Sequence, residues 1–174
     1  MKKALFFLLS IIVCIACDPA SVDLSNDNYE FDGRGGARCE VNGDEFIPRV
    51  TTSPGANSIN LAFIQHDGEE LLSFSYNNRG PDNKWLSLKI VINEINPIQN
   101  DLTGSVFEVN EVNVGSYNDG WNNEYNTNSE YIGELEIVYH DQNENILAGR
   151  FWFDAINFEN DIKFIRDGEF DLKY

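Results

Sequence analysis

Apolar and polar residues alternate one by one through much of residues 131–174. Successive side chains of a strand point to opposite faces of a sheet, so this alternation predicts strands with one buried and one exposed face. In residues 131–140 the expected buried face holds Tyr131, Leu135, Ile137 and Tyr139, and the exposed face holds Glu134, Glu136 and His140. The polar run 141–145 is expected to form a hairpin loop.

The pattern continues to the last residue of the chain. The next buried face consists of Leu147, Gly149, Phe151, Phe153 and Ala155, with Arg150 and Asp154 opposite. The last strand alternates Phe170, Leu172 and Tyr174 against Glu169, Asp171 and Lys173. Between these stretches, Asp167-Gly168 is compatible either with a tight hairpin turn or with a bulge in one longer strand, and both remain open.

Residues 37–92 alternate in the same way, with Asn42-Gly43 and Asp67-Gly68 as hairpin turns. The expected buried positions are Ala37, Cys39, Val41, Ile59, Leu61, Phe63, Leu72, Phe74, Tyr76, Leu86, Leu88, Ile90 and Ile92. No window of useful length shows the 3.6-residue period of an amphipathic helix. We therefore predict one all-β domain over residues 37–174, an antiparallel β-sandwich or partly closed β-barrel of about nine to ten strands.

The N-terminus has the features of a signal peptide. Lys2 and Lys3 precede a largely apolar run at residues 4–13, which is shorter than the ~20 residues of a membrane-spanning helix but suits the helical core of a signal peptide. The following Ile15-Ala16-Cys17 resembles a bacterial lipobox, which predicts cleavage after residue 16 and attachment of lipid, including palmitate, to Cys17. Cys14 stands where such junctions usually have Leu, so the alternative is an ordinary secretory signal cut after Ala16 or slightly later.

Residues 17–36 are rich in Asp, Ser, Asn and Gly and show no sustained period. This composition predicts a flexible tether between Cys17 and the β-domain. Cys39 is the one cysteine beyond the predicted anchor, so no disulfide can form within the domain, and its place in the alternation predicts a buried, unreactive thiol.

The strong acidity of the chain limits its partners. The formal net charge is −17; without residues 1–16 it becomes −19, because Lys2 and Lys3 are lost and no acidic residue is. Such a charge repels nucleic acid and anionic headgroups, so membrane association is expected through the N-terminal lipid alone.

Residues 115–130 place Tyr117, Trp121 and Tyr125 among amide and acidic side chains. Flat rings for stacking and amides for directed hydrogen bonds are typical of carbohydrate or peptide sites, so these three residues are the predicted ligand-binding site. The alternative is a long loop whose aromatic rings pack back onto the rim of the sheet.

We find no catalytic, metal or cofactor motif in the sequence. The two histidines, His66 and His140, are far apart and lie beside predicted hairpin loops. Residues 141–145 copy the start of a calcium loop, but Ile146 stands where that loop requires Gly. An enzyme is therefore not predicted.

The C-terminal motifs carry a resemblance to a known family. Residues 134–138, the polar loop, Gly149-Arg-Phe-Trp-Phe and Asp167-Gly-Glu-Phe-Asp-Leu-Lys-Tyr resemble the signature of a family of small Bacteroidota lipoproteins of unknown function. The resemblance implies an all-β lipoprotein of the cell envelope, held on the outer membrane at its periplasmic or surface face. We expect a binding or accessory domain with a carbohydrate, peptide or envelope-protein partner. The alternative is a structural subunit of an envelope complex, and a glycan hydrolase is a more distant possibility.

Overall fold

The structure is a computed structural model that describes residues 22–48, 58–66, 68–79, 84–93, 95, 100–120 and 123–174. These residues form eleven antiparallel strands and no helix. The strands are β1 (Gly36–Val41), β2 (Asp44–Phe46), β3 (Ile59–His66), β4 (Glu69–Arg79), β5 (Trp85–Ile92), β6 (Val106–Val109), β7 (Gly115–Asp119), β8 (Glu124–Asn126), β9 (Gly133–Asp141), β10 (Ile146–Ile156) and β11 (Ile162–Lys173).

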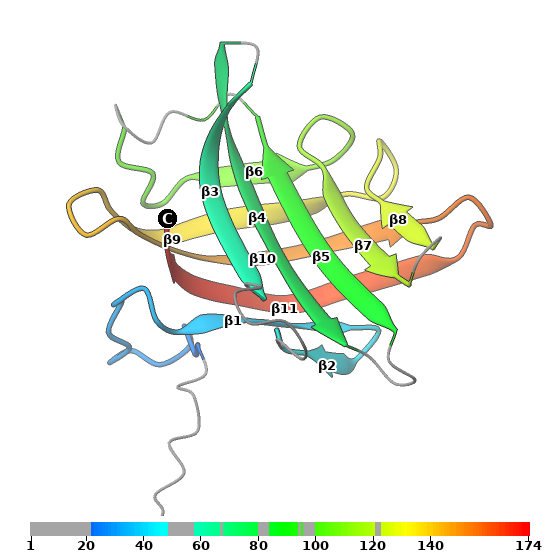
Figure 1. The fold of residues 1–174 in the computed structure, drawn as a ribbon, viewed down its shortest axis with the longest axis horizontal. Helices are drawn as coiled ribbons and strands as arrows, with labels where there is room; N and C mark the ends of the chain where they lie inside the picture. Colours follow the sequence, from blue (N-terminus) through cyan, green and yellow to red (C-terminus); the bar gives the residue numbers. More distant parts are fainter. Residues whose placement is uncertain are drawn as a thin grey trace, which may run out of the picture.

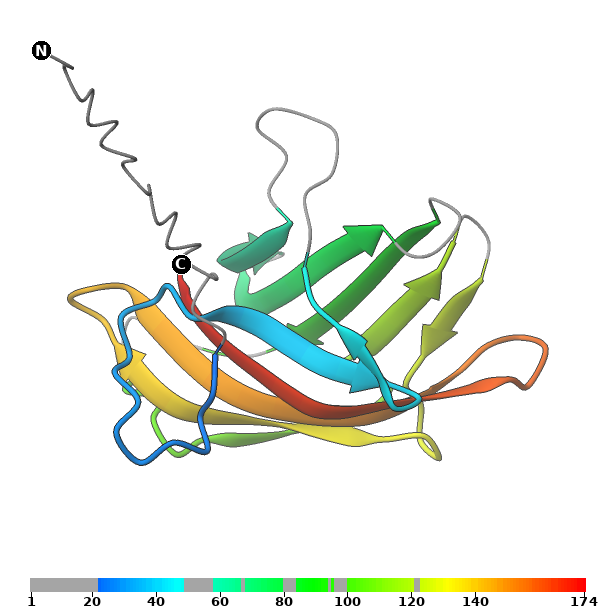
Figure 2. The same cartoon turned by 90° about the horizontal axis from the view of Figure 1, so that it is seen from below.

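The strands form one curled sheet that folds over on itself like half a barrel. One half contains β2, β1, β11, β10, β9 and β6, and the other contains β8, β7, β5, β4 and β3. The pairing of Ile156 with Asn126 joins β10 to β8 and connects the halves. In Figure 1 the second half crosses in front of β9, β10 and β11, and Figure 2 shows the halves diverging from a common side. The prediction of an all-β sandwich or partly closed barrel is confirmed.

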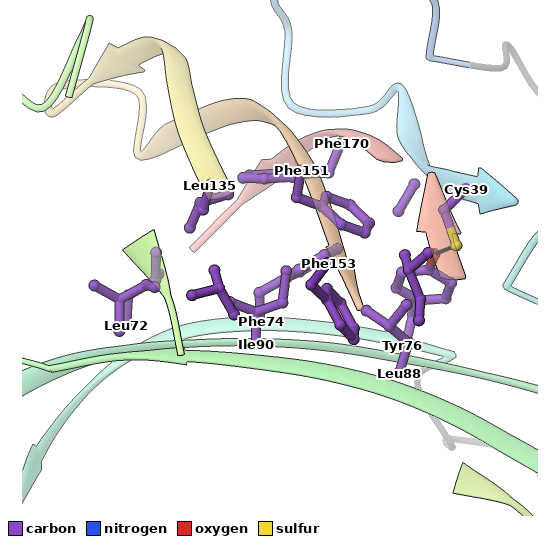
Figure 3. Packing of buried hydrophobic residues seen from close by; sticks show 14 of the residues in the cluster. Cys39, Leu72, Phe74, Tyr76, Leu88, Ile90, Leu135, Phe151, Phe153 and Phe170 are labelled. Carbon is purple, nitrogen blue, oxygen red and sulfur yellow. Dashed lines mark hydrogen bonds between the residues drawn. The ribbon is translucent and has the colours of Figure 1, made fainter. Parts of the chain in front are cut away.

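The apolar faces of the two halves meet in a single core (Figure 3). Phe74 of β4 lies at its centre, with its ring centroid 4.7 Å from that of Phe170 and 5.7 Å from that of Phe151. Full burial of one such side chain contributes about 1.5–3 kcal/mol. In β4 and β5 the side chains predicted to be buried are in this core, except that Leu86 is only partly buried.

Cys39 is buried as predicted, with 2% of its surface exposed. The hydroxyl of Tyr76 donates a hydrogen bond of 2.7 Å to its Sγ (Figure 3). Burial raises the pKa of the Cys39 thiol to about 12, so the reactive thiolate is disfavoured.

Asp167-Gly168 is a bulge inside β11 and not a hairpin turn. Asp167 has a φ of +48°, and the register of β10 against β11 shifts between the pairs Phe151–Gly168 and Phe153–Ile165. The extra residue reverses the alternation, so that Arg166 and Glu169 both point away from the core.

A second irregularity, in β9, makes the predicted faces of Tyr139 and His140 wrong. The register against β10 shifts after Ile137, and the buried and exposed positions exchange there. Tyr139 consequently lies on the outer face, stacked on Phe31 with ring centroids 4.6 Å apart. His140 is in the interior, 7% exposed.

The prediction of a flexible tether is wrong for residues 22–35, which we call the N-terminal strap. Its Val22 and Leu24 are buried, and Figure 2 shows the strap, in blue, lying along the outer side of the sheet. The carboxylate of Asp171 accepts hydrogen bonds from the Tyr29 hydroxyl (3.0 Å) and from the backbone N–H groups of Asp32 (3.3 Å) and Gly33 (3.0 Å). Residues 1–16, with the predicted signal helix, and residues 17–21 lie outside the described residues.

Candidate functional site

A groove runs over the outer face of β1, β11, β10 and β9, on the opposite side of the sheet from the core. We call it the outer groove; its volume is about 550 Å³, within the range of ~300–1,000 Å³ for ligand pockets. It is lined by Ser25, Arg38, Glu134, Glu136, Arg150, Phe151, Trp152, Arg166, Asp167, Gly168 and Glu169. The strap bounds one end of the groove through Ser25.

One rung of the sheet crosses the groove with charges of alternating sign. Arg38, Glu169, Arg150 and Glu136 are direct neighbours across β1, β11, β10 and β9. Arg38 donates from Nε (3.2 Å) and Nη2 (2.9 Å) to Oε2 of Glu169. The Nε of Arg150 lies 3.8 Å from the other oxygen of Glu169, and its Nη2 donates to the carbonyl of Leu24 in the strap. The Nη2 of Arg38 also lies 3.9 Å from a carboxylate oxygen of Asp23 in the strap, so each of the two guanidinium groups has a second partner.

The next rung contributes an aromatic surface. Trp152 is opposite Glu134 and keeps 38% of its surface exposed, although it lies in a central strand of this half. The guanidinium carbon of Arg166 lies 5.4 Å from the ring centroids of both Trp152 and Phe164. This spacing is in the range of cation–π contacts.

Arg166 is positioned by the bulge in β11. Its Nη1 donates to the carbonyls of Ile165 (2.8 Å) and Phe153 (3.2 Å), and its Nη2 lies 2.5 Å from a carboxylate oxygen of Asp154. A guanidinium with three fixed partners loses little conformational freedom when a ligand binds beside it.

The outer groove carries both donors and acceptors in near balance. Its lining includes three arginines and four acidic residues, so its formal charge is −1. Within the part of the chain that the structure describes, the carboxylates of Glu134 and Glu136 form no ion pair or hydrogen bond. They face the groove as free acceptors.

The predicted binding residues Tyr117 and Tyr125 do not belong to this groove. The described residues of this stretch, 115–120 and 123–130, contain the paired strands β7 and β8, and the two rings are in the core, 5% and 2% exposed. The prediction of exposed stacking rings is therefore wrong for both, because their positions in β7 and β8 point inward. Lys163 covers this end of the core, with its Nζ 5.3 Å from the centroid of Tyr125. Trp121 lies outside the described residues.

Of the other candidate residues, those that the structure describes show no arrangement for catalysis. Cys17 and the side chain of His66 are outside the described part of the structure. His140 is enclosed in the fold, where its ring nitrogens are hydrogen-bonded to the backbone N–H of Leu102 and the hydroxyl of Tyr174. Asp141 caps the hairpin loop, accepting from the backbone N–H of Asn143 (2.8 Å) and Glu144 (3.1 Å). Among the described residues, no group of three His, Cys, Asp or Glu side chains is placed to hold a metal ion.

A second, more apolar hollow of about 510 Å³ lies at the open edge of the barrel. Its walls are Leu61, Ala62, Phe63, Glu70, Gln142, Asn145 and Tyr174. Two of its walls, the rings of Phe63 and Tyr174, are in edge-to-face contact with their centroids 4.7 Å apart. It contains no arginine and no tryptophan, so it offers a ligand fewer directed contacts than the outer groove.

Sequence reasoning missed the outer groove, although one signal was present. Trp152 stands at a predicted exposed position of an alternating strand, between Arg150 and Asp154 on the same face. A large aromatic residue facing water is more informative than one facing the core. The contribution of Arg38 and Arg166 depends on strand register and could not be read from the sequence.

Comparisons with protein-family models, curated proteins and solved structures find no match to this chain. In the described part of the chain there is also no helix with the length and apolar character needed to cross a membrane.

Proposed function

We propose that this protein is a lipid-anchored protein of the bacterial cell envelope whose β-domain binds a ligand in the outer groove. The observation that carries the binding role is an exposed Trp152 beside fixed arginines on the outer face of a rigid sheet. Binding sites combine a few well-placed polar groups with an aromatic surface, and this groove has both. No side chains here are arranged as a nucleophile with its base, so we propose a binding or accessory role and not a catalytic one.

The anchoring role is supported by the sequence of the leader. An apolar run at residues 4–13 leads directly to Ile15-Ala16-Cys17, and a lipidated Cys17 would hold the domain on the outer membrane, facing the periplasm or the cell surface. The surface of this acidic chain has little attraction for anionic headgroups, so the acyl chains must supply the affinity at ~0.8 kcal/mol per buried CH₂.

A structural subunit of an envelope complex is the second candidate. Several large apolar side chains are exposed, among them Phe158 (79%), Val106 (56%) and Phe164 (45%). Phe164 and Trp152 share Arg166 as a neighbour, and Trp, Arg and other large side chains dominate the centres of protein interfaces. This candidate uses the same outer face with a protein in place of a small ligand.

Metabolic labelling with palmitate tests the anchor. The full-length gene is expressed in a bacterial host, and the labelled protein is compared with the variants Cys17→Ala and Cys14→Ala. We expect label in the wild type and in Cys14→Ala, and its loss in Cys17→Ala. Equal labelling of all three, or no labelling of any, would contradict lipidation at Cys17.

A further inference from the structure

We infer that the outer groove binds a neutral carbohydrate chain, stacked on Trp152 and hydrogen-bonded by the charged rung beside it. The inference rests on the proposed binding role of the groove and names its class of ligand. Three features of the outer groove support it: the aromatic and charged side chains that line it, their position on strands paired on both sides, and the pairing of its arginines with carboxylates.

Trp152 supplies the stacking surface. Its indole is 38% exposed, and Arg166 restricts its motion by lying over the ring at 5.4 Å. The C–H face of a pyranose ring is apolar and flat, so it can cover an indole that is already held in one orientation. An aromatic contact of this kind contributes more binding free energy when the ring is already ordered, because no side-chain entropy is lost on binding.

The charged rung suits hydroxyl groups better than it suits ions. A hydroxyl both donates and accepts a hydrogen bond, and the rung sets N–H donors of Arg150 beside the acceptor oxygens of Glu136 and Glu169. Directly opposed residues of a sheet have Cβ atoms about 4.5–5.5 Å apart, so two neighbouring hydroxyls on one sugar ring can meet a donor and an acceptor together.

An anionic ligand is disfavoured by the charges already present. Arg38 faces Glu169 and Asp23, Arg150 faces Glu169, and Arg166 faces Asp154. No arginine in the groove is without a carboxylate, and Glu134 and Glu136 add two further negative charges. A phosphate or uronate would have to displace one of these pairs.

An extended peptide is disfavoured by the sheet topology. Peptides that add to a sheet bond to the backbone of an edge strand. In the groove, β11 is paired on both sides by β1 and β10, and β10 by β11 and β9. Apart from Gly168 at the bulge, the groove is therefore lined by side chains and not by an unpaired strand edge, and a sugar can bind such a surface without adding a strand.

The inference is tested by screening the full-length gene product, purified after expression, against an array of neutral oligosaccharides derived from α-glucan, β-glucan, mannan and xylan. We expect saturable binding that changes by less than about twofold between low and high salt, because no net charge is neutralised. Trp152→Ala should weaken binding at least tenfold, and Glu136→Gln should weaken it severalfold without removing apolar surface. Trp85→Ala, which removes an exposed tryptophan from the other half of the sheet, is the matched control and should bind as the wild type does.

Three results would overturn the inference: no binding to any neutral glycan, binding restricted to charged polysaccharides with a steep salt dependence, or binding unaffected by Trp152→Ala and Glu136→Gln. A protein partner that is lost on Trp152→Ala, in the absence of glycan binding, overturns the carbohydrate assignment while leaving the groove as a binding site. Palmitate labelling of Cys17 is independent of all these results, so failure of the anchor is distinguished from failure of the ligand class.

Discussion

His140 shows how a single side chain couples this fold to pH. Its side chain is fully enclosed, and its Nδ1 accepts a hydrogen bond of 3.1 Å from the backbone N–H of Leu102. The neutral ring therefore carries its proton on Nε2, which lies 3.0 Å from the hydroxyl of Tyr174. A second proton on Nδ1 would face the N–H of Leu102 and break this contact.

We predict that His140 makes the domain less stable in mild acid. Burial lowers the pKa of His140 below 6.5, and the carboxylates of Asp101 and Asp141 only partly oppose the shift. The unfolded chain then binds the proton more readily, so the stability that neutral His140 contributes is complete above pH ~6.5 and is lost as the pH falls through the folded-state pKa.

Urea unfolding of wild type and His140→Gln at about pH 7.5, 6.5 and 5.5 checks this prediction. A glutamine amide can accept from Leu102 and donate to Tyr174 without titrating, so the variant should lose less free energy of unfolding across this range. Acidic groups titrate in both proteins and cancel in the comparison. Equal pH dependence of the two proteins would show that His140 is not the group responsible.

The N-terminal strap packs against the outer face of the sheet and so forms part of the domain. It covers the rung of Gly36, Asp171, Ala148 and Tyr139, which lies beside the charged rung of the outer groove. Asp171 is fully buried beneath it, and this burial raises the pKa of the Asp171 carboxyl even though three donors point at it. The strap therefore depends on one well-satisfied buried carboxylate.

Removing that carboxylate should release the strap. Asp171→Ala leaves the Tyr29 hydroxyl and the N–H groups of Asp32 and Gly33 without their acceptor, at a cost of about 1–3 kcal/mol. We expect rapid proteolysis within residues 22–35 while the β-domain stays intact. The exposed Asp27→Ala in the same strap is the control, and equal cleavage rates for both variants would mean that Asp171 does not hold the strap.

The strands could be predicted from the sequence because most of them have one buried and one solvent-exposed face. The positions that alternation predicted to be buried in β1, β4 and β10 are buried, and so are those in β5 apart from Leu86, which is partly buried. Alternation failed where a bulge exchanges the two faces, as at Tyr139 and His140, because one extra residue leaves no mark in composition. Gly133 interrupts the apolar face of β9 because there is no room for a side chain. A Cβ there would lie 2.1 Å from the carbonyl oxygen of Trp152, a long-range contact that the sequence pattern does not show.

Long-range contacts explain why the strap and the outer groove were not predicted. Asp171 bonds to Tyr29, and Glu169 bonds to Arg38, across more than 130 residues of chain. Both contacts follow from the pairing of β1 with β11, which local patterns do not encode. The exposure of Trp152 could be predicted from the alternation of its strand, whereas the arginines beside it could not, because their position depends on how the strands pair.

For the molecule as a whole, the strap shortens the link between the proposed anchor at Cys17 and the β-domain. If Cys17 carries the lipid, only the four residues 18–21 separate it from the buried Val22. The five Cα–Cα steps from residue 17 to residue 22 span at most about 18 Å when fully extended, so a lipid on Cys17 would hold the domain close to the membrane, without a twenty-residue tether. Ser25 of the strap lines the outer groove, so the proposed anchor and the proposed binding site are near one another in the molecule.

Ligand binding at Trp152 is tested most directly by the indole N–H signals of the protein. The chain has three tryptophans, so a nitrogen–proton correlation spectrum should contain three indole signals, assigned by replacing Trp85, Trp121 and Trp152 in turn by Phe. On titration with the neutral oligosaccharides, we predict that the Trp152 signal shifts and saturates while that of Trp85 stays in place. A Trp152 signal that stays in place throughout, while the Trp121 signal shifts, would contradict binding in the outer groove and move the proposed site to Trp121.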